Sequence, residues 1–157
     1  MRRIGLYAVG LVLAFSIGLT YTASSRARGA REGRRHTCSV TDRQFIETAK
    51  TNVTAVGLWG DEYLSGDAAA DEVVHEAKQA ARIVDGTNPT DPSLRETRRL
   101  MIGMFTEYGR AVEAKARGGD PGAHMYRAYG LANFAHDVLV AADAPLRRRG
   151  CSVRPFL

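Results

Sequence analysis

Apolar side chains recur at every third or fourth position through most of the chain after residue 38, and this spacing predicts amphipathic helices. Four such segments follow one another, with repeating apolar positions over Phe45 to Tyr63, Ala70 to Val84, Leu94 to Val112 and Met125 to Ala142. No segment alternates convincingly between apolar and polar residues with the period of two that is typical of a β-strand. The pattern therefore predicts an all-α domain.

Turn and capping residues separate the four predicted helices. A capping box beginning at Thr41 predicts the start of the first helix, and Asp67 is positioned to cap the second. Asp91-Pro92 and Asp120-Pro121 each place a capping carboxylate before a proline at the first helical position. Pro145 predicts the end of the fourth helix.

Short connections favour antiparallel neighbours, so the sequence predicts an up-down-up-down four-helix bundle. In that topology the first helix starts at the end of the bundle where the fourth helix finishes. The only two cysteines, Cys38 and Cys151, lie just outside those two points. We therefore expect a disulfide that closes nearly the whole domain. Disulfides persist in oxidising compartments, which predicts that the bundle lies outside the cytoplasm.

The first 37 residues have a different character. Residues 4–22 contain no charged side chain and follow Arg2 and Arg3, and 19 helical residues just span the hydrocarbon core of a bilayer. Residues 1–22 are thus expected to be a transmembrane anchor, or a signal segment cleaved after the small residues that follow it. Residues 23–37 are polar and basic and predict a flexible stalk, which leaves residues 38–157 for the bundle.

The net charge of +5 belongs to this leader. Residues 1–35 hold seven arginines and one acid, whereas residues 36–157 hold 15 basic and 16 acidic side chains. A nearly neutral bundle gives no reason to expect nucleic-acid binding. The five stalk arginines outnumber Arg2 and Arg3, so the positive-inside rule favours a cytoplasmic bundle on a reversed anchor. We give more weight to the cysteines, and the reversed orientation stays an alternative.

Basic residues also follow the fourth helix, and the expected disulfide would bring them beside the stalk. This basic end is predicted to lie nearest the lipid and to contact anionic headgroups. The alternative is a solvated tail combined with a topology signal. The lipid-proximal residues predicted in this way are Arg26, Arg28, Arg31, Arg34, Arg35, Arg147, Arg148, Arg149 and Arg154.

Few residue patterns indicate chemistry. Glu72-x-x-His75 matches half of the di-iron pattern of ferritin-like bundles, but its nearest equivalent, Asn133-x-x-His136, has an amide in place of the carboxylate. A haem bundle would use Met101 or Met104 opposite His124 or His136. The Glu72 and His75 pattern is more typical of a solvated helix face. Methionines at helical spacing are more typical of core packing. We therefore predict no catalytic residue, metal or cofactor, with a metal- or haem-binding carrier or oxidase as the alternative.

Trp59, Tyr63 and Tyr126 are expected near the end of the bundle that is distal from the membrane, among several acidic residues. Five glycines inside the predicted helices each cost about 1 kcal/mol relative to alanine, which suggests roles in packing or access. The aromatic residues predict a patch or shallow cleft for a protein or small-molecule partner. Alternatively, they close the end of the bundle. The favoured interpretation is a non-enzymatic, extracytoplasmic binding module.

Overall fold

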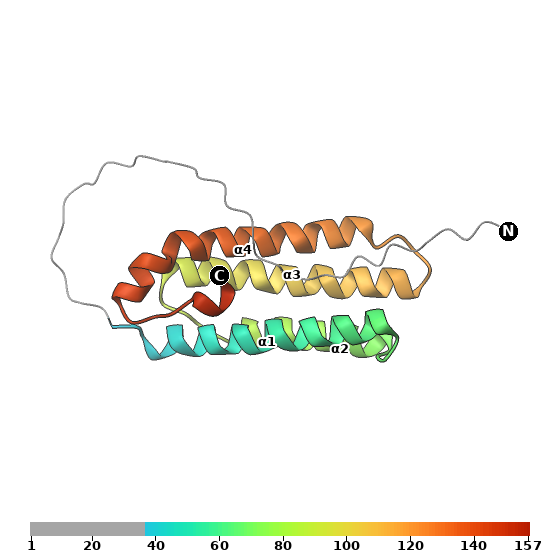
Figure 1. Cartoon of the computed structure of the whole chain (residues 1–157), viewed down its shortest axis with the longest axis horizontal. Helices are drawn as coiled ribbons and strands as arrows, with labels where there is room; N and C mark the ends of the chain where they lie inside the picture. Colours follow the sequence, from blue (N-terminus) through green and yellow to red (C-terminus); the bar gives the residue numbers. More distant parts are fainter. Residues whose placement is uncertain (1–36) are drawn as a thin grey trace.

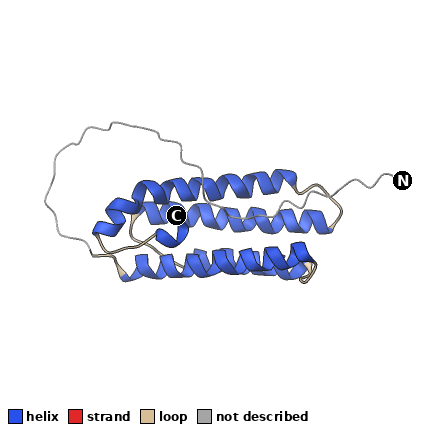
Figure 2. Cartoon of the chain, viewed as in Figure 1, coloured by secondary structure: helices blue, strands red, loops and turns tan. Residues whose placement is uncertain are grey.

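The computed structural model describes residues 37–157, which are helical and contain no strand (Figure 2). Figure 1 shows each of four helices running back beside the preceding one, as in a helical bundle. The elements are α1 (Val40–Ser65), α2 (Ala70–Asp85), α3 (Pro92–Ala116), α4 (Gly122–Arg148) and a short 3-10 helix, η1 (Arg154–Phe156).

The predicted membrane segment at residues 4–22 and the stalk residues up to 36 lie outside the described part of the chain. Within residues 37–157, no helix has both the length and the apolar character needed to cross a bilayer.

The core is built around α3, which packs against α1, α2 and α4. Phe45 of α1, Phe105 of α3 and Leu139 of α4 are each 1% exposed. The C-terminal segment contributes as well, because Val153 is fully buried and Phe156 packs against the core. Figure 1 shows η1 between α1 and α4. The described residues after α4 therefore complete the core at the end of the bundle where α1 begins.

The helix α1 begins earlier than its sequence predicts. The N-cap is Ser39, whose hydroxyl accepts a hydrogen bond from the backbone N–H of Asp42 at 3.0 Å. The predicted capping box at Thr41 is therefore wrong, because Thr41 already lies in the first turn. The residue before the cap is also tied to the end of α4, because the Cys38 N–H donates to the Arg149 carbonyl.

The capping prediction is confirmed for α3, where the Asp91 carboxylate accepts from two backbone N–H groups of the first turn. It is wrong for α2, because Glu72 reaches back to the Ala69 N–H while Asp67 accepts from Ser65. At α4 the N-cap position is Pro121, and the carboxylate of Asp120, one residue earlier, accepts a hydrogen bond from the N–H of Gly122, the first residue of the helix.

Pro145 does not end α4, which continues to Arg148. A proline removes one helical N–H and costs roughly 3 kcal/mol inside a helix. The next residue, Leu146, is fully buried, and its carbonyl accepts hydrogen bonds from Arg149 and Cys151. The burial and hydrogen bonds of Leu146 thus favour continuation of α4 beyond the end that Pro145 predicts.

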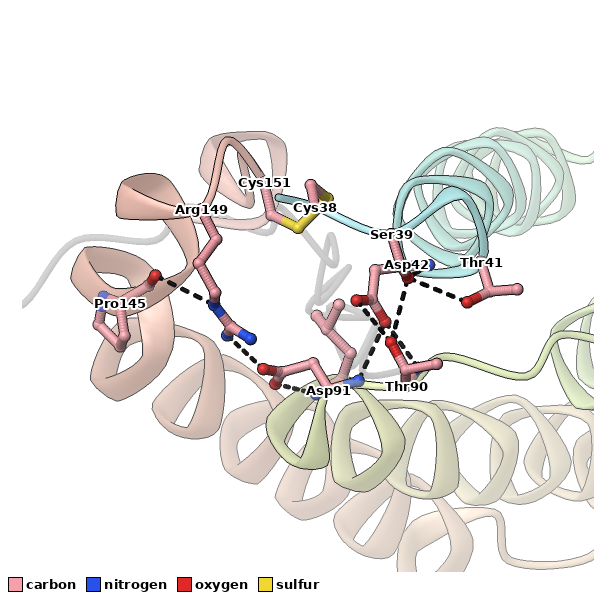
Figure 3. Close-up of a disulfide and its surroundings, with 10 residues drawn as sticks. Cys38, Ser39, Thr41, Asp42, Thr90, Asp91, Pro145, Arg149 and Cys151 are labelled. Carbon is pink, nitrogen blue, oxygen red and sulfur yellow. Dashed lines mark hydrogen bonds and ion pairs between the residues drawn. A yellow bond between two sulfur atoms is a disulfide. The ribbon is translucent and has the colours of Figure 1, made fainter. Parts of the chain in front are cut away.

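Cys38 and Cys151 form a disulfide between the start of α1 and the segment after α4 (Figure 3). Their Cα atoms are 5.1 Å apart although the residues are 113 positions apart in the sequence. The predicted pairing of the two cysteines is confirmed, and so is the placement of the first and last helix ends at one pole.

Polar side chains extend this connection to the loop between α2 and α3. The Asp42 carboxylate accepts hydrogen bonds from the N–H groups of Thr90 and Asp91, at 2.7 and 3.0 Å, and from the Thr90 hydroxyl at 2.9 Å. Asp91 in turn forms an ion pair with Arg149 (Figure 3). We call the disulfide together with Asp42, Thr90, Asp91 and Arg149 the terminal clasp.

Burial alone would raise the pKa of the Asp42 carboxyl. The hydrogen bonds from the Asp91 backbone, Ser39 and Thr90 outweigh burial and hold this pKa below its usual value. The Asp42 carboxylate therefore stabilises the fold when it is ionised.

Replacing both cysteines, as in C38S/C151S, is expected to lower the free energy of unfolding by about 2–5 kcal/mol, because the unlinked unfolded chain gains entropy. Urea unfolding of the full chain in a non-ionic detergent measures the change. Reduction of the unmodified protein should give a similar loss. Equal urea midpoints for the variant and the oxidised protein would contradict the prediction.

Asp42→Asn is expected to lower the free energy of unfolding at pH 7 by about 1–3 kcal/mol, because the amide leaves some clasp donors poorly bonded. A carboxylate with a depressed pKa stabilises above its unfolded pKa of about 3.9, and this contribution disappears as pH falls through the folded pKa. The difference between variant and parent should therefore shrink below about pH 4. A pH-independent difference in urea unfolding would exclude ionised Asp42 as its source.

Candidate functional site

A shallow depression of about 460 Å³ lies between α1 and α2, toward the end of the bundle away from the terminal clasp. Trp59 of α1 forms one wall, and the exposed side of α2 forms the other. The lining residues from α2 are Asp71, Glu72, His75 and Glu76. We call this feature the Trp59 depression.

The periodicity of α2 explains why these four residues lie together. Val73 and Ala77 are fully buried and fix which side of α2 faces the core. Asp71 and His75 are four positions apart and therefore occupy one face of the helix, away from Val73 and Ala77. Among residues 37–157, no group of three or more His, Cys, Asp or Glu side chains is arranged to hold a metal ion.

The hairpin formed by α1 and α2 carries an unbalanced negative charge at this end. Residues 51–77 contain six acidic side chains and no lysine or arginine. None of the six forms an ion pair with a lysine or arginine elsewhere in the described part of the chain. The negative potential is therefore available to a cationic ligand. The six residues are Asp61, Glu62, Asp67, Asp71, Glu72 and Glu76.

A second depression, of about 480 Å³, lies on the other side of α2, against α3. Asp71 and His75 line both depressions and so form the ridge between them. The second depression also includes Lys78 and Arg117, so its carboxylates have basic neighbours. Only the Trp59 depression combines an aromatic ring with an exclusively acidic and histidine wall.

The three aromatic residues that the sequence suggests as a binding patch have different surroundings in the structure. Trp59 lines the depression, whereas Tyr63 lies under Lys115, whose Nζ is 5.1 Å from the ring centroid. Tyr126 is 80% exposed at the start of α4 and lines neither depression. The α2 acids that accompany Trp59 were missed as site residues, although the run without basic residues is visible in the sequence.

Three of the helical glycines have a packing role. A Cβ atom at Gly60 would collide with the Tyr108 hydroxyl, and one at Gly103 would come within 3.1 Å of Leu131. Gly109 similarly faces Ala77. Close packing therefore accounts for these three glycines.

Burial, with smaller contributions from the charges of Asp61 and Tyr63, raises the pKa of Tyr108.

Gly57 and Gly130 are different. A Cβ atom at either position would meet no other atom within 4 Å in the described structure. A glycine in a helix interior costs about 1 kcal/mol relative to alanine. Packing among the described residues does not explain this cost.

The histidines and methionines considered for a haem site make other contacts. His124 Nδ1 is 2.8 Å from Glu107 Oε2, and His136 Nδ1 is 3.2 Å from the Phe156 carbonyl oxygen. Met101 is 4% exposed within the core cluster, and Met104 packs against it. These contacts hold the side chains in the packing of α3, α4 and the C-terminal segment.

Glu107 of α3 contacts two side chains at the start of α4, His124 and Arg127. Its carboxylate contacts His124 and Arg110, the latter at 2.6 Å, and Arg127 lies farther away at 3.4 Å. The hydrogen bond from His124 is the strongest influence that lowers the pKa of Glu107, and the two arginines add to it against the effect of burial. This cluster stabilises the contact between α3 and α4.

The predicted basic end is only partly available for binding. Arg149 belongs to the terminal clasp, and Arg147 forms an ion pair with Asp143 at 3.1 Å. Arg148 and Arg154 form no ion pair with a described acidic residue. The five stalk arginines lie outside the described residues.

Comparison of the chain with known protein families, curated proteins and solved structures found no match.

Proposed function

We propose that the chain is a non-enzymatic interaction module, held at or exported across a membrane, whose α1–α2 hairpin binds a cationic segment of a protein partner. The Trp59 depression carries the proposal. There, one aromatic ring lies beside three carboxylates that have no lysine or arginine partner among the described residues.

The proposed location outside the cytoplasm is supported by the Cys38–Cys151 disulfide, since such bonds persist in oxidising compartments. Residues 4–22 would supply the membrane anchor or the cleaved signal. Arg148 and Arg154 would face anionic headgroups together with the stalk arginines, at about 1 kcal/mol for each well-placed side chain.

The proposed ligand chemistry follows from the lining of the depression. A guanidinium or ammonium group is attracted both by carboxylates and by the face of a tryptophan ring. The depression is shallow and lies between two helices. This shape suits a side chain of a bound peptide better than a small molecule, which needs an enclosed pocket. An arginine-rich segment therefore matches the charge and the aromatic wall.

The test uses Trp59, the only tryptophan, as the reporter. Titration of the full chain with hexa-arginine at physiological salt should change the tryptophan fluorescence in a saturable way. The variant D71N/E76Q should weaken binding about 5- to 10-fold, because it removes two partly exposed charges from the wall. Glu72 is left unchanged because it caps α2.

Glu47→Gln is the matched control, since Glu47 is an exposed acid on α1 outside the depression. It should bind hexa-arginine as the parent does. Equal affinities for D71N/E76Q and Glu47→Gln, or no saturable change in the parent, would refute the proposed site.

A further inference from the structure

The helix α4 presents a regular row of residues away from the core. These positions follow one another at intervals of four, three, four, three and four, which is the heptad spacing of a helix–helix seam. All are exposed except Gly130, which is partly exposed. The row, which we call the α4 seam, consists of Ala123, Arg127, Gly130, Phe134, Asp137 and Ala141.

Large apolar side chains lie on this side of α4. Phe134, within the seam, is 64% exposed, and Tyr126 and Val140 along one edge are 80% and 52% exposed. Between residues 128 and 142, Asp137 is the only charged residue. A long apolar and charge-poor face on a surface helix is typical of a site that another protein covers.

Gly130 gives the seam a notch. Apart from the surrounding backbone of α4 and the adjacent residues, no described atom lies within 4 Å of the position that its Cβ would occupy, so packing within the described structure does not require a glycine there. Gly103 differs, because Leu131 fills the space beside it. A notch next to an exposed phenylalanine offers a place for a large side chain from another molecule.

The seam is complementary to itself when a second copy is turned end to end. An antiparallel pair centred on position 132 matches Gly130 with Phe134 and Arg127 with Asp137 of the other copy. It also matches Ala123 with Ala141. Each match therefore occurs twice, and antiparallel coiled coils pair heptad positions in this way.

We propose that two copies of this chain associate through their α4 seams as an antiparallel, two-fold symmetric pair. Phe134 of each copy fills the notch at Gly130 of the other, and Arg127 pairs with Asp137 across the interface. The seam spans about 27 Å of helix, so the paired surface is small and we expect weak association, with a dissociation constant in the micromolar range.

The charged residues of the seam are available for this pairing. Arg127 is 57% exposed and is the most distant of the three side chains that contact the Glu107 carboxylate, at 3.4 Å. Asp137 is exposed and forms no ion pair with a described lysine or arginine. When Arg127 turns from Glu107 toward Asp137 of the second copy, Glu107 keeps its two closer partners, His124 and Arg110.

The antiparallel arrangement puts the two terminal clasps at opposite ends of the pair. The bundle is about 40 Å long, from the 27 residues of α4, and a 15-residue stalk reaches about 50 Å when extended. Both stalks are thus long enough to reach one membrane, although Arg148 and Arg154 of only one copy would then lie at its surface. An exported chain could form the same pair.

The first test is Gly130→Leu in the full chain, with Gly57→Leu as the matched control, since neither glycine has a neighbour within 4 Å. Sedimentation equilibrium in a density-matched non-ionic detergent gives the dissociation constant. Filling the notch should raise it at least 10-fold without lowering the thermal midpoint. Gly57→Leu should leave it unchanged. A monomeric parent at several hundred micromolar, or equal constants for both variants, would overturn the proposal.

The second test fixes the register. Asp137→Arg places two arginines together across the interface and should raise the dissociation constant about 5- to 10-fold. The swapped variant R127D/D137R restores opposite charges and should return it to within about twofold of the parent. Failure of the swap to restore association lost in Asp137→Arg would overturn the antiparallel pairing.

Discussion

The closure of the chain at one pole of the bundle is the constraint on which the rest of the structure depends. The Cys38–Cys151 disulfide joins residues 113 positions apart, and Asp42 connects the same pole to the loop before α3. Three separate segments are therefore fixed at one end by covalent and charge-assisted contacts. The buried carboxylates of Asp42 and Asp91 need hydrogen-bond donors or a cation. Loss of any one contact of the clasp therefore leaves the remaining polar groups less well paired.

This closure leaves the two ends of the molecule chemically different. The clasp pole uses its buried carboxylates, Asp42 and Asp91, for internal hydrogen bonds and an ion pair. The opposite pole has the hairpin of α1 and α2, where acids lack basic partners among the described residues. A binding surface at the far pole can thus change its contacts without disturbing the residues that hold the fold together.

Local sequence patterns predict those features of the structure that depend on interactions between neighbouring residues. The apolar period predicts four helices, and Asp91-Pro92 predicts the start of α3, because both depend on neighbouring residues. The start of α1 at Ser39 and the continuation through Pro145 depend on contacts with distant parts of the chain. The neighbours of Trp59 depend on the rotation of α2 against α1. The difference between Gly103 and Gly130 likewise appears only after the helices are packed.

The oxidation state of Cys38 and Cys151 in cells shows whether the terminal clasp is closed there. Cells are lysed directly into denaturant that contains an alkylating reagent, with or without prior reduction, and the mass of the isolated chain is then measured. We expect no alkylated cysteine before reduction and two after it. Two alkylated cysteines without reduction would contradict both the clasp as the cellular state of the protein and the location inferred from it.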